Sequence, residues 1–146
     1  MTRVIVLNGP NLNLLGTREP ATYGTATLAD VEALVRQRAG GLGVEVEFIQ
    51  SNHEGELVDA VQQLAARADG AIVNLGAYTH TSLALRDAFL AVPFPFVEVH
   101  LSNLHRREVE RRHSLTADLA IGLIMGFGPR GYVLALEALV AALSDG

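Results

Sequence analysis

Glu98 and His100 stand two residues apart at the end of a short apolar run. If that run is a strand, both side chains point to the same face, and a carboxylate lies beside an imidazole. A carboxylate orients an imidazole and raises its basicity, which is the usual arrangement for a general acid. A histidine on its own is more often structural, but the carboxylate on the same face favours a catalytic pair here.

A second polar group follows another apolar run, where hydroxyl and amide side chains crowd the segment from Asn74 to Ser82. Capping of a helix accounts for one or two of these side chains. An uncompensated helix N-terminus also offers N–H groups to an anion, and His80 adds a titratable donor there. We expect a ligand site at this turn, with simple capping as the alternative.

The segment that follows Asn8 runs for roughly twenty residues before the next helical pattern, whereas strand-to-helix connections usually have about 2 to 6. Gly16 and Gly24 bracket a part of it that carries Arg18 and Tyr23, which is typical of a hinged lid. An arginine beside a tyrosine stabilises phenolate and lowers the pKa of the phenol, so that the tyrosine becomes a usable base. A solvated surface loop is the open alternative.

Residues 105 to 113 form the one locally basic stretch. Arg107 and Arg111 are four apart and would share a face if the segment is helical, where they could clamp an anionic substrate. A solvated face of ion pairs is the alternative, and it is the favoured interpretation for Arg106 and Arg112.

Two further patterns carry no site. Gly126 to Gly131 reads G-x-G-x-x-G, but it follows the last predicted strand, and Asp145 in the tail is no match for the acidic residue that a dinucleotide fingerprint requires. We interpret these glycines as a tight turn. The spacing of His100, His105 and His113 fits no recurrent ligand pattern, so we expect no metal.

Composition excludes several kinds of chemistry. All 11 cationic residues among the 146 are arginine, and the chain has neither lysine nor cysteine. Schiff-base, pyridoxal and P-loop chemistry each need a lysine, while disulfides, thiol nucleophiles and iron–sulfur clusters need cysteine. What remains for nucleophilic and proton-transfer chemistry is oxygen acids, imidazole and phenol.

The charge pattern limits the partners. The formal net charge is −5 and the isoelectric point is near 5.4, which argues against a nucleic-acid partner. Apolar runs are far shorter than the roughly 20 residues that span a bilayer, and the N-terminus lacks a signal-peptide layout. We therefore expect a cytoplasmic protein with no membrane partner.

Short apolar runs alternate with segments of helical period. The expected strands are Arg3 to Asn8, Val44 to Gln50, Ala71 to Asn74, Phe96 to His100 and Leu119 to Gly126. The expected helices are Leu28 to Arg38, Leu57 to Ala68, Thr81 to Ala91 and Gly131 to Leu143. Thr27 and Asp30 predict a capping pair for the first helix, and glycines 40, 41 and 43 its end.

This alternation predicts an α/β fold over residues 1–146, taken as a single catalytic domain. We expect a flavodoxin-like, doubly wound, five-stranded parallel sheet in a three-layer sandwich, with strand order 2-1-3-4-5. Near-continuous apolar character suits strands that helices cover on both faces, most of all the last two, while the alternating second strand suits an edge. The ligand crevice should lie beyond the carboxyl ends of strands 1, 3 and 4.

Several motifs in order resemble type II 3-dehydroquinate dehydratase over nearly the whole chain. They are Asn8-Gly9-Pro10-Asn11-Leu12, Arg18-Glu19-Pro20, Tyr23-Gly24, Ser51-Asn52-His53-Glu54-Gly55, Thr79-His80-Thr81-Ser82, Leu85-Arg86-Asp87 and Glu98-Val99-His100-Leu101-Ser102-Asn103. Leu75 departs from the proline or small residue common in that family, and the last helix matches only in character.

The resemblance implies a trans elimination of water from 3-dehydroquinate through an enolate to 3-dehydroshikimate, a step of the shikimate pathway and of aromatic amino acid biosynthesis, without cofactor, metal or Schiff base. Quinate breakdown also uses this step, so the resemblance leaves the pathway open.

The resemblance also implies site roles. Tyr23 is the expected base, Arg18 supports its phenolate and Arg107 assists; His100, oriented by Glu98, is the expected acid, and Asn11 positions a water. The expected substrate contacts are Leu101 and Ser102 with the carboxylate, and Asn74, His80 and Arg111 with the ring hydroxyls. Asp87 would reach a neighbouring subunit's site in a homododecamer built from trimers.

Two other functions stay open on the residues alone. A non-catalytic flavodoxin-like binding or signalling module has the same fold, but the end of the first strand carries Asn8 and Asn11 where a phospho-receiver has acids and a flavin binder has hydroxyls. A purely structural subunit would leave the polar residues at three strand ends unexplained.

Overall fold

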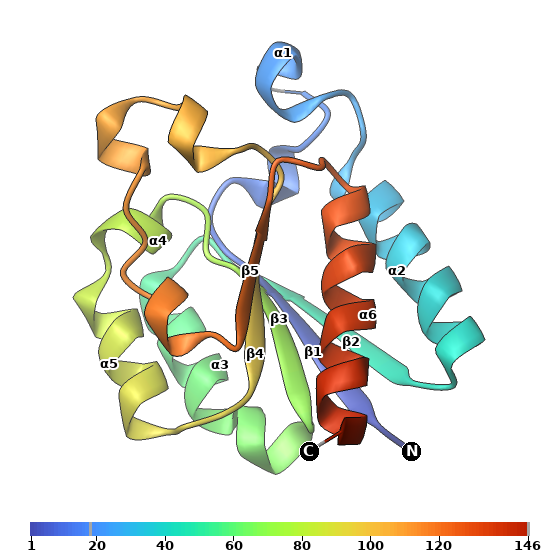
Figure 1. Cartoon of the computed structure of the whole chain (residues 1–146). Helices are drawn as coiled ribbons and strands as arrows, with labels where there is room; N and C mark the ends of the chain where they lie inside the picture. Colours follow the sequence, from blue (N-terminus) through green and yellow to red (C-terminus); the bar gives the residue numbers. More distant parts are fainter. Residues whose placement is uncertain (18, 146) are drawn as a thin grey trace.

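The computed structural model describes residues 1–17 and 19–145, and at Tyr23 it describes the backbone only. One parallel sheet organises this part of the chain, with strands in the order β2-β1-β3-β4-β5 (Figure 1). The strands are β1 (Arg3–Asn8), β2 (Glu45–Gln50), β3 (Gly70–Asn74), β4 (Phe96–His100) and β5 (Gly122–Met125). The predicted fold class and strand order are confirmed.

Helices cover both faces of the sheet. The pair α2 (Leu28–Leu42) and α6 (Arg130–Asp145) lies on one side, and α3 (Glu54–Arg67) and α5 (Leu83–Ala91) lie on the other (Figure 1). Two helices of one turn, α1 (Pro20–Tyr23) and α4 (Tyr78–Thr81), lie in the loops. The 3-10 turns are η1 (Leu12–Leu14), η2 (Leu104–Arg106), η3 (Val109–Arg111) and η4 (Ala117–Leu119).

The period of two along β1 divides the core. Val4 and Val6 pack into the cluster under α2 and α6, whereas Ile5 and Leu7 pack into the cluster under α3 and α5. All four are fully buried. Burial of such a side chain contributes roughly 1.5 to 3 kcal/mol, so both helical layers hold this strand in register.

The first long helix begins as predicted and ends later. Asp30 N donates to Thr27 Oγ1 at 3.1 Å and Thr27 N donates to Asp30 Oδ2 at 2.9 Å, which completes a capping box. The helix passes through Gly40 and Gly41 and ends at Gly43, where φ is +70°. Ala39 is buried and Leu42 packs on the core, and this contact outweighs the cost of about 1 kcal/mol for each helical glycine.

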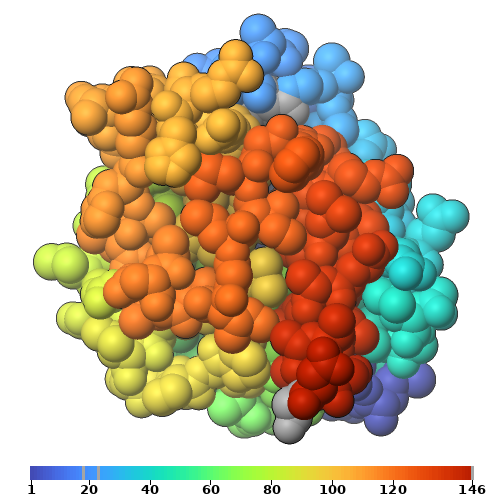
Figure 2. Space-filling view, viewed as in Figure 1, coloured from blue at the N-terminus to red at the C-terminus, as the bar shows by residue number. Residues whose placement is uncertain are grey.

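The last strand was predicted from Leu119 to Gly126 with helices over both faces, and the prediction was wrong in its length and in its burial. Only Gly122–Met125 pair with β4, because Leu119 ends the turn η4. Gly122 and Leu123 are exposed, and Figure 2 shows this orange segment at the surface. Within this chain β5 is an edge with one open side. The buried β4 and the alternating edge strand β2 agree with the prediction.

The parallel strands bring their last residues to one edge of the sheet. Asn8 and Asn74 are register partners at the ends of β1 and β3, and His100 ends β4. No helix in the described part of the chain is long and apolar enough to cross a membrane.

Candidate active site

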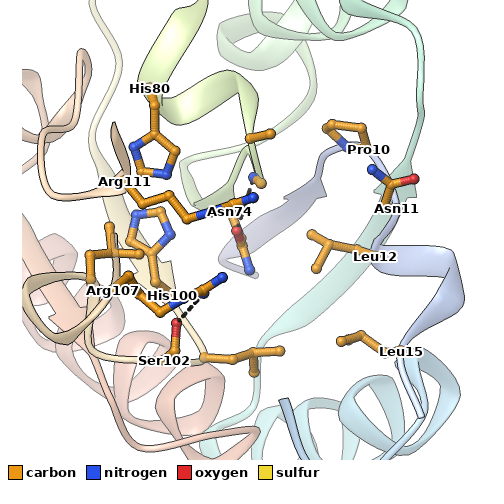
Figure 3. Close-up of a pocket in the computed structure, with 14 residues that line it drawn as sticks. Pro10, Asn11, Leu12, Leu15, Asn74, His80, His100, Ser102, Arg107 and Arg111 are labelled. Carbon is orange, nitrogen blue, oxygen red and sulfur yellow. Dashed lines mark hydrogen bonds between the residues drawn. The ribbon is translucent and has the colours of Figure 1, made fainter. Parts of the chain in front are cut away.

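A cavity opens at the carboxyl edge of β1, β3 and β4, as the strand order predicted. Figure 3 shows two histidines and two arginines along one wall and apolar side chains from η1 and its flanks along the opposite wall. The lining residues are Pro10, Asn11, Leu12, Leu15, Asn74, Gly76, Ala77, His80, His100, Leu101, Ser102, Leu104, Arg107 and Arg111. Eight of the residues singled out from the sequence therefore meet here.

The Glu98 and His100 side chains form a buried pair at the end of β4. Glu98 Oε2 and His100 Nε2 are 2.8 Å apart, and both side chains are at most 5% exposed. Glu98 Oε1 also accepts from Thr116 Oγ1 at 2.5 Å and from Ser114 Oγ at 3.1 Å. Burial would raise the pKa of Glu98, but His100 and the two hydroxyls outweigh it and lower this pKa. The carboxylate is therefore ionised and oriented, as the spacing predicted.

His80 packs against this pair from α4. Its ring stacks on the His100 ring with centroids 6.5 Å apart (Figure 3). His80 Nδ1 is 2.9 Å from the carbonyl oxygen of His113, which can only accept, so Nδ1 carries the proton. Burial, with His100 and Arg111 nearby, lowers the pKa of His80. In a neutral ring Nε2 is then an acceptor. The prediction that His80 donates to a ligand is corrected: its proton on Nδ1 is used by the backbone, and Nε2 can only accept.

The turn that holds His80 differs from the predicted helix. The segment expected as one helix from Thr81 to Ala91 divides into α4 and α5, with Ser82 between them. Ser82 Oγ accepts from Leu85 N at 2.9 Å and caps α5. The predicted uncompensated helix N-terminus is therefore wrong, and His80 belongs to the turn before that cap.

Arg107 and Arg111 both line the cavity, but they do so from turns instead of an α-helix. Arg107 Nη1 donates to Ser102 Oγ at 3.0 Å (Figure 3), and Arg111 Nε lies 2.6 Å from Glu108 Oε1. The helical-face prediction is wrong because two 3-10 turns interrupt the segment. Arg106 and Arg112 are exposed and outside the cavity, as expected.

Asn11 sits at the rim in a left-handed conformation, with φ at +67°. Asn11 N donates to Asn52 Oδ1 at 2.9 Å, and Gln50 Nε2 donates to the same oxygen at 3.1 Å. A non-glycine residue in this conformation costs about 1 kcal/mol or more. Asn52, which the sequence singled out only within a motif, therefore holds Asn11 in place.

Asn74 connects the cavity to the core. Its Oδ1 accepts from Gly76 N at 3.1 Å, and its Nδ2 donates to Tyr132 Oη at 2.9 Å. Tyr132 Oη donates to Asn8 Oδ1 at 2.6 Å. Sequence reasoning assigned no role to Tyr132, although one phenol on the buried face of an apolar helix was a usable signal.

A close approach shapes the loop after β3. A Cβ at Gly9 would lie 2.3 Å from the carbonyl oxygen of Leu75, so only glycine fits at position 9. Leu75 itself, the departure from the family pattern, is buried in the core under α3 and α5.

Of the predicted residues whose side chains are described, Glu98 and Asp87 do not line the cavity. Glu98 is bonded to His100, which does line it. Asp87 is exposed on α5. Arg18 lies outside the described residues, and so does the side chain of Tyr23, which ends α1. The expected phenolate and its arginine therefore stay a prediction. Among the described residues, no group of three or more His, Asp or Glu side chains could hold a metal ion.

The model of the family described as Dehydroquinase class II matches residues 2–140. The chain belongs to this family. This class II dehydroquinase is 62% identical to the 3-dehydroquinate dehydratase of Gemmatimonas aurantiaca over 138 residues, which cover 94% of this chain and 91% of that protein. It is 55% identical to Catabolic 3-dehydroquinase 1 of Aspergillus terreus over 134 residues, 92% of this chain and 88% of that protein.

A solved structure agrees with the fold. The type II dehydroquinase from Butyrivibrio crossotus superposes on this dehydroquinase with a TM-score of 0.92 and 40% identity, covering 95% of this chain and 97% of that one. The protein is therefore a hydro-lyase, and the alternative of a non-catalytic flavodoxin-like module is set aside.

Proposed function

We propose that this dehydroquinase converts 3-dehydroquinate to 3-dehydroshikimate by trans elimination of water through an enolate, with the residues of the described cavity in the roles below. The observation that carries the proposal is the buried Glu98–His100 pair on a cavity that Arg107 and Arg111 also line. A proton leaves the carbon next to the ketone, a hydroxyl leaves with a second proton as water, and a carbon–carbon double bond forms.

His100 is the acid of the second step. Its Nε2 faces ionised Glu98, so this nitrogen keeps its proton and Nδ1 is the ring nitrogen left for the substrate. When the ring is doubly protonated, Nδ1 delivers its proton to the departing hydroxyl and the ring becomes neutral. Glu98 stabilises the charged ring beforehand and keeps its orientation.

Tyr23 is the base of the first step, with Arg18 stabilising its phenolate and Arg107 assisting. Asn11 positions a water against the enolate oxygen. The left-handed backbone at Asn11, fixed by Asn52, supports this role because it places a polar side chain on the cavity rim.

The remaining lining residues bind the substrate. Leu101 and Ser102 hold its carboxylate, largely through backbone N–H groups, and the Arg107 guanidinium bonded to Ser102 adds positive charge there. Arg111, Asn74 and His80 hold the ring hydroxyls. His80 accepts through Nε2, because its Nδ1 proton is committed to a backbone carbonyl.

The enzyme works as one catalytic domain, residues 1–146, in a cytoplasmic homododecamer of trimers, with no cofactor. In the assembly Asp87 reaches the site of a neighbouring subunit; its exposed position on α5, away from this chain's own cavity, supports that assignment. Biosynthesis of aromatic amino acids is the proposed role. The name of the Aspergillus terreus relative points to catabolism in that organism.

Adding 3-dehydroquinate to the purified chain tests the reaction. The conjugated enone of the product absorbs in the ultraviolet, so absorbance should rise with enzyme concentration. The matched control is Arg106→Gln, which removes an exposed arginine outside the cavity and should leave the rate unchanged. A folded chain that gives no rise in absorbance would refute the proposal.

Mixing two weakly active variants tests the subunit contact. Tyr23→Phe and Asp87→Asn chains should each be weak, yet hybrids place an intact Tyr23 beside an intact Asp87 in a fraction of sites. The variants are unfolded together, refolded and checked for hybrids by native mass spectrometry, and turnover should exceed that of either variant refolded alone. If hybrids form and turnover stays at the average of the parents, Asp87 does not act across subunits.

A further inference from the structure

A phenol links the cavity to the far helix layer. Tyr132 is fully buried near the start of α6, and its hydroxyl sits between the last side chains of β1 and β3. Those two residues, Asn8 and Asn74, are register partners and are themselves almost completely buried. Of the three, only Asn74 lines the cavity.

The direction of this hydrogen-bond chain follows from one backbone group. The N–H of Gly76 can only donate, so the Asn74 atom that faces it at 3.1 Å must be Oδ1. Asn74 Nδ2 then faces Tyr132 Oη and donates to it at 2.9 Å. An inverted amide would set two donors against each other at Gly76.

The phenol proton is thereby directed away from the cavity. Because Tyr132 Oη accepts from Asn74, its single proton goes to Asn8 Oδ1 at 2.6 Å. This arrangement leaves Asn8 Nδ2 without a hydrogen-bond partner among the described residues, although this nitrogen is buried. Inverting the Asn8 amide would set a second N–H donor against a phenol oxygen that already accepts from Asn74, and it would leave the phenol proton without the acceptor that lies at 2.6 Å.

Asn74 is consequently held at both ends of its amide. One Nδ2 proton is bonded to Tyr132, and the described contacts leave the other without a partner on a side chain that lines the cavity. Burial raises the pKa of Tyr132 well above its ordinary value, so the phenol stays neutral and the direction holds at any working pH.

We propose that Tyr132, held by Asn8, is a positioning residue that makes Asn74 present an N–H donor, and not its carbonyl, to a ring oxygen of the substrate. The proposal rests on the proposed function. The proposal places this donor on a ring hydroxyl that is not eliminated, so a loss of the Asn74 orientation weakens the binding of substrate and transition state equally. Such a loss raises KM and leaves kcat unchanged.

The test begins with Tyr132→Phe, which removes only the hydroxyl. We expect KM for 3-dehydroquinate to rise roughly tenfold, the loss expected for one oriented neutral hydrogen bond, with kcat within threefold of wild type. The matched control is Tyr78→Phe, which loses a hydroxyl bond to the backbone oxygen of Asn52 and should leave KM within twofold. Unchanged KM in folded Tyr132→Phe, or a fall in kcat alone, would overturn the proposal.

A double variant shows whether the effect runs through Asn74. In an Asn74→Ala background, Tyr132→Phe should raise KM no further, whereas a general packing defect would act equally in both backgrounds. Asn8→Leu provides a second route that keeps the phenol: it removes the acceptor, frees the hydroxyl proton to turn, and should raise KM several-fold. If Tyr132→Phe does not fold, Asn8→Leu decides by the same criterion.

A measurement without substrate separates this proposal from the proposed function. In the 15N-labelled chain, the Asn74 side-chain amide protons, assigned by their loss in Asn74→Ala, should exchange with solvent at least tenfold faster in Tyr132→Phe than in wild type. If wild type fails to dehydrate 3-dehydroquinate, the proposed function fails and this exchange rate alone decides the positioning role. An exchange rate that does not change would refute it.

Discussion

Charged side chains gather at both ends of the sheet, and their surroundings differ. At the amino ends of β1 and β2, Arg3 pairs with Glu45 at 3.0 Å, and Arg67 pairs with Glu47 farther along β2. Each of these side chains is more than 40% exposed. At the carboxyl end of β4, the Glu98–His100 pair is at most 5% exposed and two hydroxyls bond the same carboxylate.

The difference shows why ion pairing alone does not mark a site. Water screens an exposed pair, which contributes about 0 to 1 kcal/mol. A buried carboxylate needs every neighbour that stabilises its charge, and it in turn holds the histidine beside it in one orientation. The amino end is therefore a solvated surface, and the carboxyl end, with its buried pair beside a cavity, is the candidate site.

Removing the imidazole of His100 should cause the largest loss of activity. We expect His100→Asn to lower kcat about 10² to 10⁴-fold, because a positioned general acid contributes that much. Steady-state rates by enone absorbance measure this. A decrease below tenfold in a folded variant would place the acid elsewhere and remove the contrast between the two ends of the sheet.

The Glu98 carboxylate should make the free energy of unfolding depend on pH in the acidic range. Its pKa is lower in the folded chain than the ordinary 4.5, so its stabilising contribution is present above that value and is lost as the pH falls toward the lower folded pKa. At pH 7 we expect Glu98→Gln to lower the free energy of unfolding by about 1 to 3 kcal/mol, as for a hydrogen bond to a charged group.

Urea unfolding at several pH values checks this dependence. The difference between wild type and Glu98→Gln should shrink steadily below pH 4.5, whereas Glu45→Gln at the opposite end should show a small difference throughout. A gap for Glu98→Gln that widens on acidification would contradict the direction of the pKa shift.

The smallest effect on stability and activity is expected for the exposed ion pair of Arg67, away from the cavity. Arg67→Gln should change stability by less than about 1 kcal/mol and leave kcat and KM at wild-type values, because its ion pair is exposed. Denaturation and rate measurements on the one variant are sufficient. A clear loss of turnover would mean that the solvated end of the sheet communicates with the cavity.

Local sequence patterns predicted most of the scaffold. Strand order and the cover of β4 followed from short apolar runs that alternate with helical periods, and the Thr27 capping box followed from two residue types at one spacing. The Glu98–His100 contact followed from the period of a strand. These features depend on neighbours in the chain, where bond geometry leaves few alternatives.

Other features depended on partners that are distant in the chain. The run that predicted a buried last strand carried no information on whether a layer covers β5, and the spacing of Arg107 and Arg111 did not reveal the 3-10 turns between them. Arg18 and Tyr23 were chosen from local chemistry, and their arrangement stays a prediction.

By itself the sequence determined the α/β sheet, the edge of the sheet at which the cavity opens and the residue types available there, because each follows from periodicity and composition. Only the tertiary structure decided that Tyr132, 124 residues from Asn8, orients Asn74, and that His80 is an acceptor. Hydrogen-bond direction depends on which donors and acceptors meet after folding, and no local pattern records a partner that packing brings from the other end of the chain.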